Sequence, residues 1–246
     1  MAPVAVGLAL LAAWTWSTAT GLVPPYLLPS PGKVAAHLAN SFVPSVLPAA
    51  LETLRAALLG SAVAVLVAAP LAYIVWRWRA VDAALSPFLA ASQAVPAIAL
   101  APLLAVWLGY GMTPIVVLCA LIVFFPIFVS TLGALRGIDA DLLDAARLDG
   151  TTPGQLLVHI QAPLALPGFL AGLSAGFPLS ITGAVVGEFM LGGKGMGVLL
   201  TAQRQAANTA GLFATILVLA VMASLFYLAL QLVERLSPTV AALRSK

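Results

Sequence analysis

The stretch Asp139-Ala-Asp-Leu-Leu-Asp-Ala-Ala-Arg-Leu-Asp-Gly-Thr-Thr-Pro-Gly154 holds four of the eight acidic residues and one of the eleven basic residues of this 246-residue chain. The chain as a whole is 62% hydrophobic and only 8% charged. An ordinary soluble domain has a charged fraction of about 25%. Water or a polar partner must therefore meet the chain at this stretch, whereas the sequence around it is typical of lipid-buried segments.

Leucine and alanine recur at helical spacing between the carboxylates, which predicts a short helix over residues 139–149. We expect Gly150 to end this helix in the left-handed conformation, Thr151 or Thr152 to cap the next helix, and Pro153 to occupy its first turn. Because membrane-spanning sequence flanks it, the short helix is expected to lie on the membrane surface with its apolar stripe available to a soluble partner. Periodicity alone fits an ordinary solvated loop helix equally well.

The same region resembles a motif of a transporter family. Asp144-Ala-Ala146 is followed after three residues by Gly150, and after nine more by Ile160-Gln-Ala-Pro163. This spacing resembles the EAA loop, E-A-A-x3-G-x9-I-x-L-P, of binding-protein-dependent ABC importer permeases, with Asp144 in place of Glu and Ala162 in place of Leu. The resemblance implies a type I ABC importer fold in which a cytoplasmic coupling helix, within a loop at about residues 139–163, docks onto a separate ATPase subunit. The residues that it assigns to the ATPase contact are Asp144, Ala145, Ala146, Arg147, Gly150, Ile160 and Pro163.

Stretches without Asp, Glu, Lys or Arg recur along the chain, and a bilayer crossing needs roughly 20 apolar residues. These stretches are 2–32, 56–76, 83–135, 150–187 and 205–233. The third is long enough for two crossings, so we predict an all-α membrane protein with about six spans in a single domain, residues 1–246. The predicted spans lie at about 4–21, 54–76, 85–108, 113–135, 164–189 and 211–233. A cleaved signal peptide is the alternative for the first span, but no basic segment precedes it.

The basic residues favour one orientation. If both termini are cytoplasmic, seven basic residues lie inside and four outside, which follows the positive-inside tendency. The inside set is Arg77, Arg79, Arg136, Arg147, Arg235, Arg244 and Lys246, and the outside set is Lys33, Arg55, Lys194 and Arg204. Because the basic residues form no stripe, nucleic acid is not expected as a partner.

Polar and aromatic residues in or near the spans are candidates for a transport route. They are Gln93, Trp107, Phe124, Phe125, Ser180, Thr182 and Glu188. The aromatic residues would serve equally for helix packing, and Glu188 could instead pair with Lys194 or Arg204. Prolines and glycines predict that the fifth span is interrupted. Near the start of the second span, Glu52 and Arg55 are spaced to form an ion pair on one helix face.

Shorter matches narrow the resemblance to one branch. Leu28-Pro-Ser-Pro31 after the first span resembles a segment of the nitrate, sulfonate and taurine permeases. Residues 92–111, Phe124-Phe-Pro-Ile127 and Ala202-Gln-Arg-Gln205 resemble the subgroup proposed to import thiamine-precursor pyrimidines, a hydroxymethylpyrimidine type of solute. Gly192-Gly-Lys-Gly195 lacks the spacing of a Walker A loop, so no nucleotide site is expected on this chain.

The family resemblance implies an inner-membrane permease that works with a second permease, in a homodimer. It also implies two ATPase subunits that carry ATP and Mg, and a periplasmic or lipid-anchored binding protein. No cofactor, metal or catalytic group is expected on this chain. The alternative is a secondary transporter or channel, which would need ionisable residues inside the spans, where almost none occur.

Overall fold

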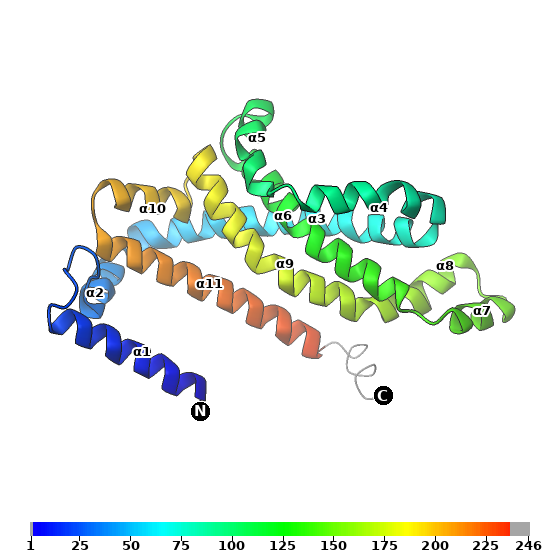
Figure 1. Ribbon diagram of the computed structural model, residues 1–246, viewed down its shortest axis with the longest axis horizontal. Coiled ribbons are helices and arrows are strands. Elements are labelled where there is room, and N and C mark those ends of the chain that lie inside the picture. Colours follow the sequence, from blue (N-terminus) through cyan, green and yellow to red (C-terminus); the bar gives the residue numbers. More distant parts are fainter. Residues whose placement is uncertain (1, 237–246) are drawn as a thin grey trace.

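The computed structural model describes residues 2–236, and the side chains of residues 2–4, 90, 92, 93 and 233–236 lie outside that description. Every element in the described range is helical (Figure 1). The α-helices are α1 (Ala2–Ala19), α2 (Pro31–Ser41), α3 (Leu47–Arg77), α4 (Arg79–Gln93), α5 (Ala101–Leu108), α6 (Met112–Arg136), α7 (Ala140–Leu148), α8 (Pro153–Leu156), α9 (Ala162–Leu191), α10 (Met196–Gln205) and α11 (Thr209–Leu236). Two π-helical turns, η1 (Phe42–Val46) and η3 (Leu157–Gln161), and one 3-10 turn, η2 (Ala97–Leu100), join some of them.

Four helical stretches in the described range are long and apolar enough to cross a bilayer. They are Pro31–Arg77, Met112–Arg136, Pro153–Leu191 and Thr209–Leu232. They contain the second, fourth and fifth predicted spans and all but the last residue of the sixth, so the all-α membrane fold is confirmed. The first predicted span corresponds to α1, whose described apolar part, Ala5–Ala19, is shorter. The total of six crossings stays a prediction.

The core forms where α6 packs between α3 and α9, and small residues let these helices approach closely. A Cβ atom added at Gly60 of α3 would lie 2.3 Å from the Cβ of Cys119 in α6. A Cβ atom added at Gly172 of α9 would lie 2.7 Å from the carbonyl oxygen of Pro126, also in α6. Cys119 is fully buried where these helices meet.

The segment predicted as one span, 85–108, is not a single continuous helix. Helix α4 ends at Gln93, and the chain turns at Ala94–Pro96 before η2 and α5 continue along a different direction (Figure 1). The break has a local cause, because Pro96 has no N–H to donate and its ring disfavours a helical conformation at Val95.

The predicted interruption of the fifth span is wrong, because α9 runs without a break through Pro167 and Pro178. Each proline removes one backbone hydrogen bond, which a long helix packed against a neighbour can tolerate. The irregular turn lies just ahead of α9, in η3. In a regular α-helix the ring of Pro163 would collide with the carbonyl four residues earlier. A π-turn joins residues five apart instead of four, and η3 provides such a turn just before this proline.

The long helices give the molecule two ends (Figure 1). We call them the α7 end, which carries α7 and α8, and the α10 end, which carries α2 and α10. Four of the predicted inside cations, Arg77, Arg79, Arg136 and Arg147, lie at the α7 end. The four predicted outside cations, Lys33, Arg55, Lys194 and Arg204, lie at the α10 end. The remaining predicted inside cations, Arg235, Arg244 and Lys246, fall outside the described side chains.

Candidate functional site

The first candidate site is α7, a short helix held by capping interactions at both of its boundaries. The Asp139 side chain accepts a hydrogen bond from the N–H of Asp141 at 2.9 Å, which caps the start of the helix. Gly150 ends it with φ of +80°, a left-handed conformation that glycine adopts without strain. Thr152 and Gln155 then form a capping box at the start of α8, with Pro153 in its first turn. The predicted helix, turn and helix are confirmed, and hydrogen-bonded caps flank the turn on both sides.

One face of α7 anchors it and another is left exposed. The Leu143 side chain is buried, whereas Leu148 is 89% exposed. The two residues are five positions apart, so they point to different sides of the helix. Asp144 and Arg147 form an ion pair of 2.6 Å on the surface of α7, and exposed pairs of this kind contribute little to stability. Of the other residues assigned to the ATPase contact, Ala145 is exposed and Ala146, Ile160 and Pro163 are half-buried.

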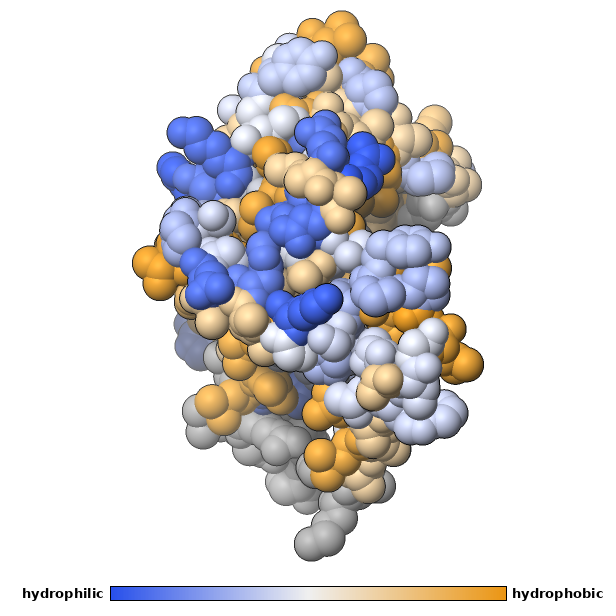
Figure 2. Space-filling model, turned by 90° about the vertical axis from the view of Figure 1, so that its left-hand side faces the viewer, coloured by the Kyte–Doolittle hydropathy of each residue, from blue (hydrophilic) through white to orange (hydrophobic). Residues whose placement is uncertain are grey.

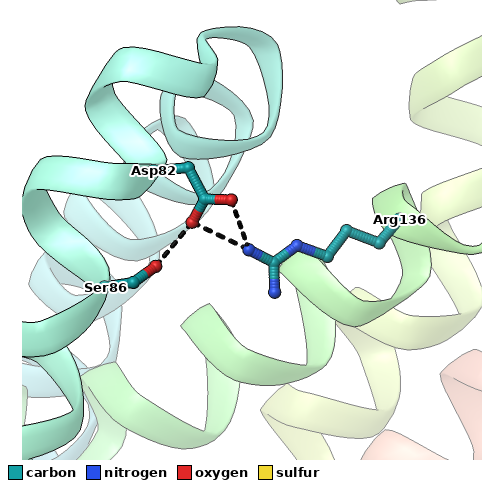
Figure 3. A network of polar contacts seen from close by, with 3 residues as sticks. All are labelled: Asp82, Ser86 and Arg136. Atoms are coloured by element: carbon teal, nitrogen blue, oxygen red, sulfur yellow. Dashed lines mark hydrogen bonds and ion pairs between the residues drawn. The ribbon is translucent and has the colours of Figure 1, made fainter.

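A second ion pair supports the segment that leads into α7 (Figure 3). Two residues after the end of α6, the chain turns toward α7, and the last residue of α6, Arg136, donates to both carboxylate oxygens of Asp82 in α4 at 2.8 Å. Ser86, one turn further along α4, also donates to Asp82. The Ser86 hydrogen bond, together with the Arg136 guanidinium, holds the pKa of Asp82 below its usual value. The sequence did not indicate this pair, because its members are 54 residues apart.

The second candidate site is an open cavity of about 360 Å³ beside the break between α4 and α5. Two of the predicted route residues, Phe125 of α6 and Thr182 of α9, line it together. The other seven residues that line this cavity are Val95, Pro96, Ala97, Ile98, Leu121, Ile122 and Leu179. None of the nine lining residues is charged. The structure therefore brings one aromatic ring and one hydroxyl to a largely apolar cavity.

The remaining predicted route residues lie elsewhere. Ser180 is fully buried and donates to the carbonyl oxygen of Phe177 in its own helix at 2.7 Å. Phe124 stacks on Phe128, with ring centroids 5.5 Å apart, and Trp107 of α5 is 68% exposed. The side chain of Gln93 lies outside the described residues.

Glu188 lies in the last turn of α9, toward the α10 end of the molecule, and is only 3% exposed. Its Oε1 accepts a hydrogen bond from Thr53 of α3 at 2.8 Å, and its Oε2 accepts one from the N–H of Gly197 at 2.7 Å. Thr53 in turn accepts from the N–H of Met196 at 2.8 Å. Three elements, α3, α9 and α10, meet at this carboxylate. Nothing in the sequence pointed to Thr53, which lies 135 residues from its partner.

Two predicted ion pairs at this end are not formed. Among the described residues, neither Lys194 nor Arg204 forms an ion pair with Glu188, because Thr53 and Gly197 occupy its carboxylate. The described side chains of Glu52 and Arg55 do not pair with each other either. They open instead into a cavity of about 320 Å³, which Glu188 and Lys194 also line. Figure 2 looks onto this end of the molecule, where hydrophilic side chains gather in a band bordered by hydrophobic ones.

Residues 56–239 match the sequence profile of the family described as "Binding-protein-dependent transport system inner membrane component". The chain belongs to this family. It is therefore a multi-pass membrane permease of the ABC importer type, as the resemblance of its EAA-like loop predicted.

The names of similar proteins fit the branch of permeases that the shorter motifs indicated. The riboflavin transport system permease protein RibX of Chloroflexus aurantiacus is 39% identical over 228 residues, which cover 92% of this chain and 85% of the relative. The formylaminopyrimidine transport permease protein ThiX of Halalkalibacterium halodurans is 32% identical over 215 residues, covering 86% of this chain and 85% of the relative.

Among solved structures, the permease resembles a chain of the MetNI methionine ABC transporter in an inward-facing conformation. The TM-score is 0.67 at 18% sequence identity, and the match covers 79% of this chain and 96% of that chain. At this identity the likeness concerns the fold, and it confirms the predicted type I ABC importer architecture.

Proposed function

We propose that this permease conducts a small planar nitrogen heterocycle, of the class to which pyrimidines and flavins belong, and that ATP hydrolysis on separate subunits drives the import. Helix α7 is the proposed docking element for the ATPase. In this proposal the α7 end faces the cytoplasm and the α10 end faces the periplasm.

The coupling role is supported by two features of α7 together: its surface is exposed, and a continuous helical segment connects it to the membrane-spanning helix α9. Helix α7 presents Leu148 to the surroundings, and its cap at Gly150 leads directly into α8. From Pro153 to Leu191 the chain is helical over 39 residues, which corresponds to about 58 Å. A displacement of α7 by a docked partner can therefore be transmitted along α9.

The choice of solute class rests on the cavity beside Phe125. Aromatic faces and a few hydrogen-bonding groups suit a flat heterocycle, and the volume of about 360 Å³ lies within the range of small-molecule sites. A sulfonate or nitrate ion would instead require a cation or several donors, and the lining residues are uncharged. The two named relatives support the same class, since their names refer to riboflavin and formylaminopyrimidine.

The assembly that fits this proposal contains two copies of the permease, two ATPases with ATP and Mg, and a binding protein that delivers the solute at the α10 end. Four exposed cations at that end, Lys33, Arg55, Lys194 and Arg204, would lie in the periplasm. The cations at the α7 end would lie in the cytoplasm, which agrees with the positive-inside tendency.

The experiment that tests the solute class is uptake into proteoliposomes that hold the complete complex. Labelled riboflavin, a formylaminopyrimidine and taurine would each be offered with the cognate binding protein. We expect uptake of a heterocycle, and a several-fold loss of that uptake in Phe125→Leu. The matched control is Phe189→Leu, because Phe189 lines a different cavity. Uptake of taurine alone, or equal uptake by both variants, would contradict the assignment.

A further inference from the structure

An open groove of about 440 Å³ lies between α9, α10 and α11 at the α10 end of the molecule. We propose that it binds one anionic phospholipid, with the phosphate on Arg204 and an acyl chain along α11. The residues that line the groove are Phe189, Leu200, Thr201, Arg204, Leu212 and Ile216. The proposal does not depend on which solute the permease carries.

Apolar side chains form most of the length of the groove. Leu200 is only 9% exposed, whereas Phe189 is 48% and Ile216 is 53% exposed. Leu212 and Ile216 are four residues apart, so they lie on one face of α11, about 6 Å apart along its axis. Because α11 is long and apolar enough to span the bilayer, a hydrocarbon chain can lie against these residues and contact α9 and α10 as well.

The polar end of the groove lies beside the turn between α10 and α11. Arg204 is the next-to-last residue of α10, and the chain doubles back after it so that α11 runs beside α10 (Figure 1). Leu200 and Ile216 are therefore both further from the turn than Arg204 and Leu212 are. The apolar stretch of α11 begins at Thr209, which places Arg204 at the boundary of the hydrocarbon, the depth at which phospholipid head groups lie.

The charge at this end selects the head group. Arg204 is exposed, and among the described side chains it forms no ion pair. A guanidinium can donate two parallel hydrogen bonds to a phosphate. None of the six lining residues is acidic, so the choline of a zwitterionic lipid would meet no carboxylate in the groove. A lipid with a net negative head group therefore fits better.

A second copy of this chain is a poorer match for the same groove. The described acidic residues at the α10 end are Glu52 and Glu188. The carboxylate of Glu188 is buried and already accepts hydrogen bonds from Thr53 and Gly197. A protein surface that covered Arg204 would have to pair its charge, and this end of a second copy offers little to do so.

The test is a titration of the full chain in detergent with two lipids, followed by native mass spectrometry. Dioleoyl phosphatidylglycerol and dioleoyl phosphatidylcholine share their acyl chains and differ in head-group charge. Arg204→Gln removes the cation, and Ile216→Trp fills the apolar part of the groove. The matched controls are Arg55→Gln, an exposed arginine at the same end that lines a different cavity, and Val221→Trp, a 56% exposed residue of α11 that lines another groove.

We expect the native chain to bind phosphatidylglycerol more tightly than phosphatidylcholine by about tenfold, the effect of one charged hydrogen-bonded contact. Arg204→Gln should abolish this preference, and Ile216→Trp should weaken the binding of both lipids, while the two controls behave as the native chain. Equal affinity of the native chain for the two lipids, or equal losses in a variant and its control, would overturn the proposal.

Occupation of the groove by a second copy gives a different result. Ile216→Trp would then convert dimers to monomers in the same spectra, and Arg204→Gln would leave the lipid preference unchanged, which also overturns the proposal. Unfolding temperatures equal to the native value show that the variants fold. If Ile216→Trp does not fold, the comparison of Arg204→Gln with Arg55→Gln decides, since only the first should lose the preference.

Discussion

The exposed side chain of Leu148 gives the sharpest test of α7 as a docking element. In the isolated chain this side chain is 89% exposed, so its replacement by alanine removes almost no internal packing. If an ATPase covers it, the change removes three carbon atoms from the interface. At about 0.8 kcal/mol for each buried methylene group, the loss is roughly 2 kcal/mol. Each 1.4 kcal/mol corresponds to about a tenfold change in affinity, so binding should weaken by roughly 30-fold.

The assay is a titration of fluorescent ATPase against the permease in lipid nanodiscs. We expect Leu148→Ala to raise the Kd by about that factor while its thermal unfolding temperature stays at the native value. Leu22→Ala is the control, because Leu22 is 69% exposed and follows α1 at the α10 end. An affinity for Leu148→Ala within threefold of the native value would refute the reasoning that α7 inserts its apolar tip into the partner.

Three further predictions concern the helices and caps that hold α7 in place. Gly150→Ala forces a side chain into the left-handed conformation at a cost of about 1–2 kcal/mol, so stimulation of the ATPase by loaded binding protein should fall, whereas Gly154→Ala should leave it unchanged. Because the pKa of Asp82 is lowered in the folded state, its stabilising effect is present above its unfolded value of 3.8 and is lost as the pH falls through the folded pKa. The difference in unfolding temperature between native protein and Asp82→Asn should therefore be present at pH 7 and shrink steadily as the pH falls below 3.8, and a difference that does not shrink would contradict the ion-pair account. Gly172→Ala should destabilise the protein by about 1–3 kcal/mol because its Cβ would meet the backbone of α6, whereas Gly133→Ala meets nothing within 4 Å and should be neutral in the same thermal unfolding assay.

Local chemistry made α7 predictable from the sequence. The caps at Asp139, Gly150 and Thr152 depend only on residues within a few positions of one another, and the structure contains each of them. The long apolar stretches likewise predicted four of the membrane-spanning helices, because bilayer thickness sets their minimum length.

Where a prediction from the sequence was wrong or incomplete, contacts between residues far apart in the chain explain the difference. Pro96 broke a helix and Pro167 did not, because α9 is held along its length by close packing against α6. Proline content alone does not distinguish these cases. The partner of Glu188 was missed for a related reason, since Thr53 is a common residue type in a small-residue helix and only the fold brings it within 2.8 Å.

In the proposed function, ATP hydrolysis on a partner subunit drives solute through this permease. The most direct measurement is uptake of a labelled heterocycle into proteoliposomes, with the complete complex or this chain alone, and with or without ATP on the ATPase side. We expect uptake only when ATPase, ATP and loaded binding protein are all present, and loss of that uptake in Leu148→Ala at limiting ATPase concentration. Uptake by the chain alone, without ATP, would contradict it and would favour a secondary transporter or channel.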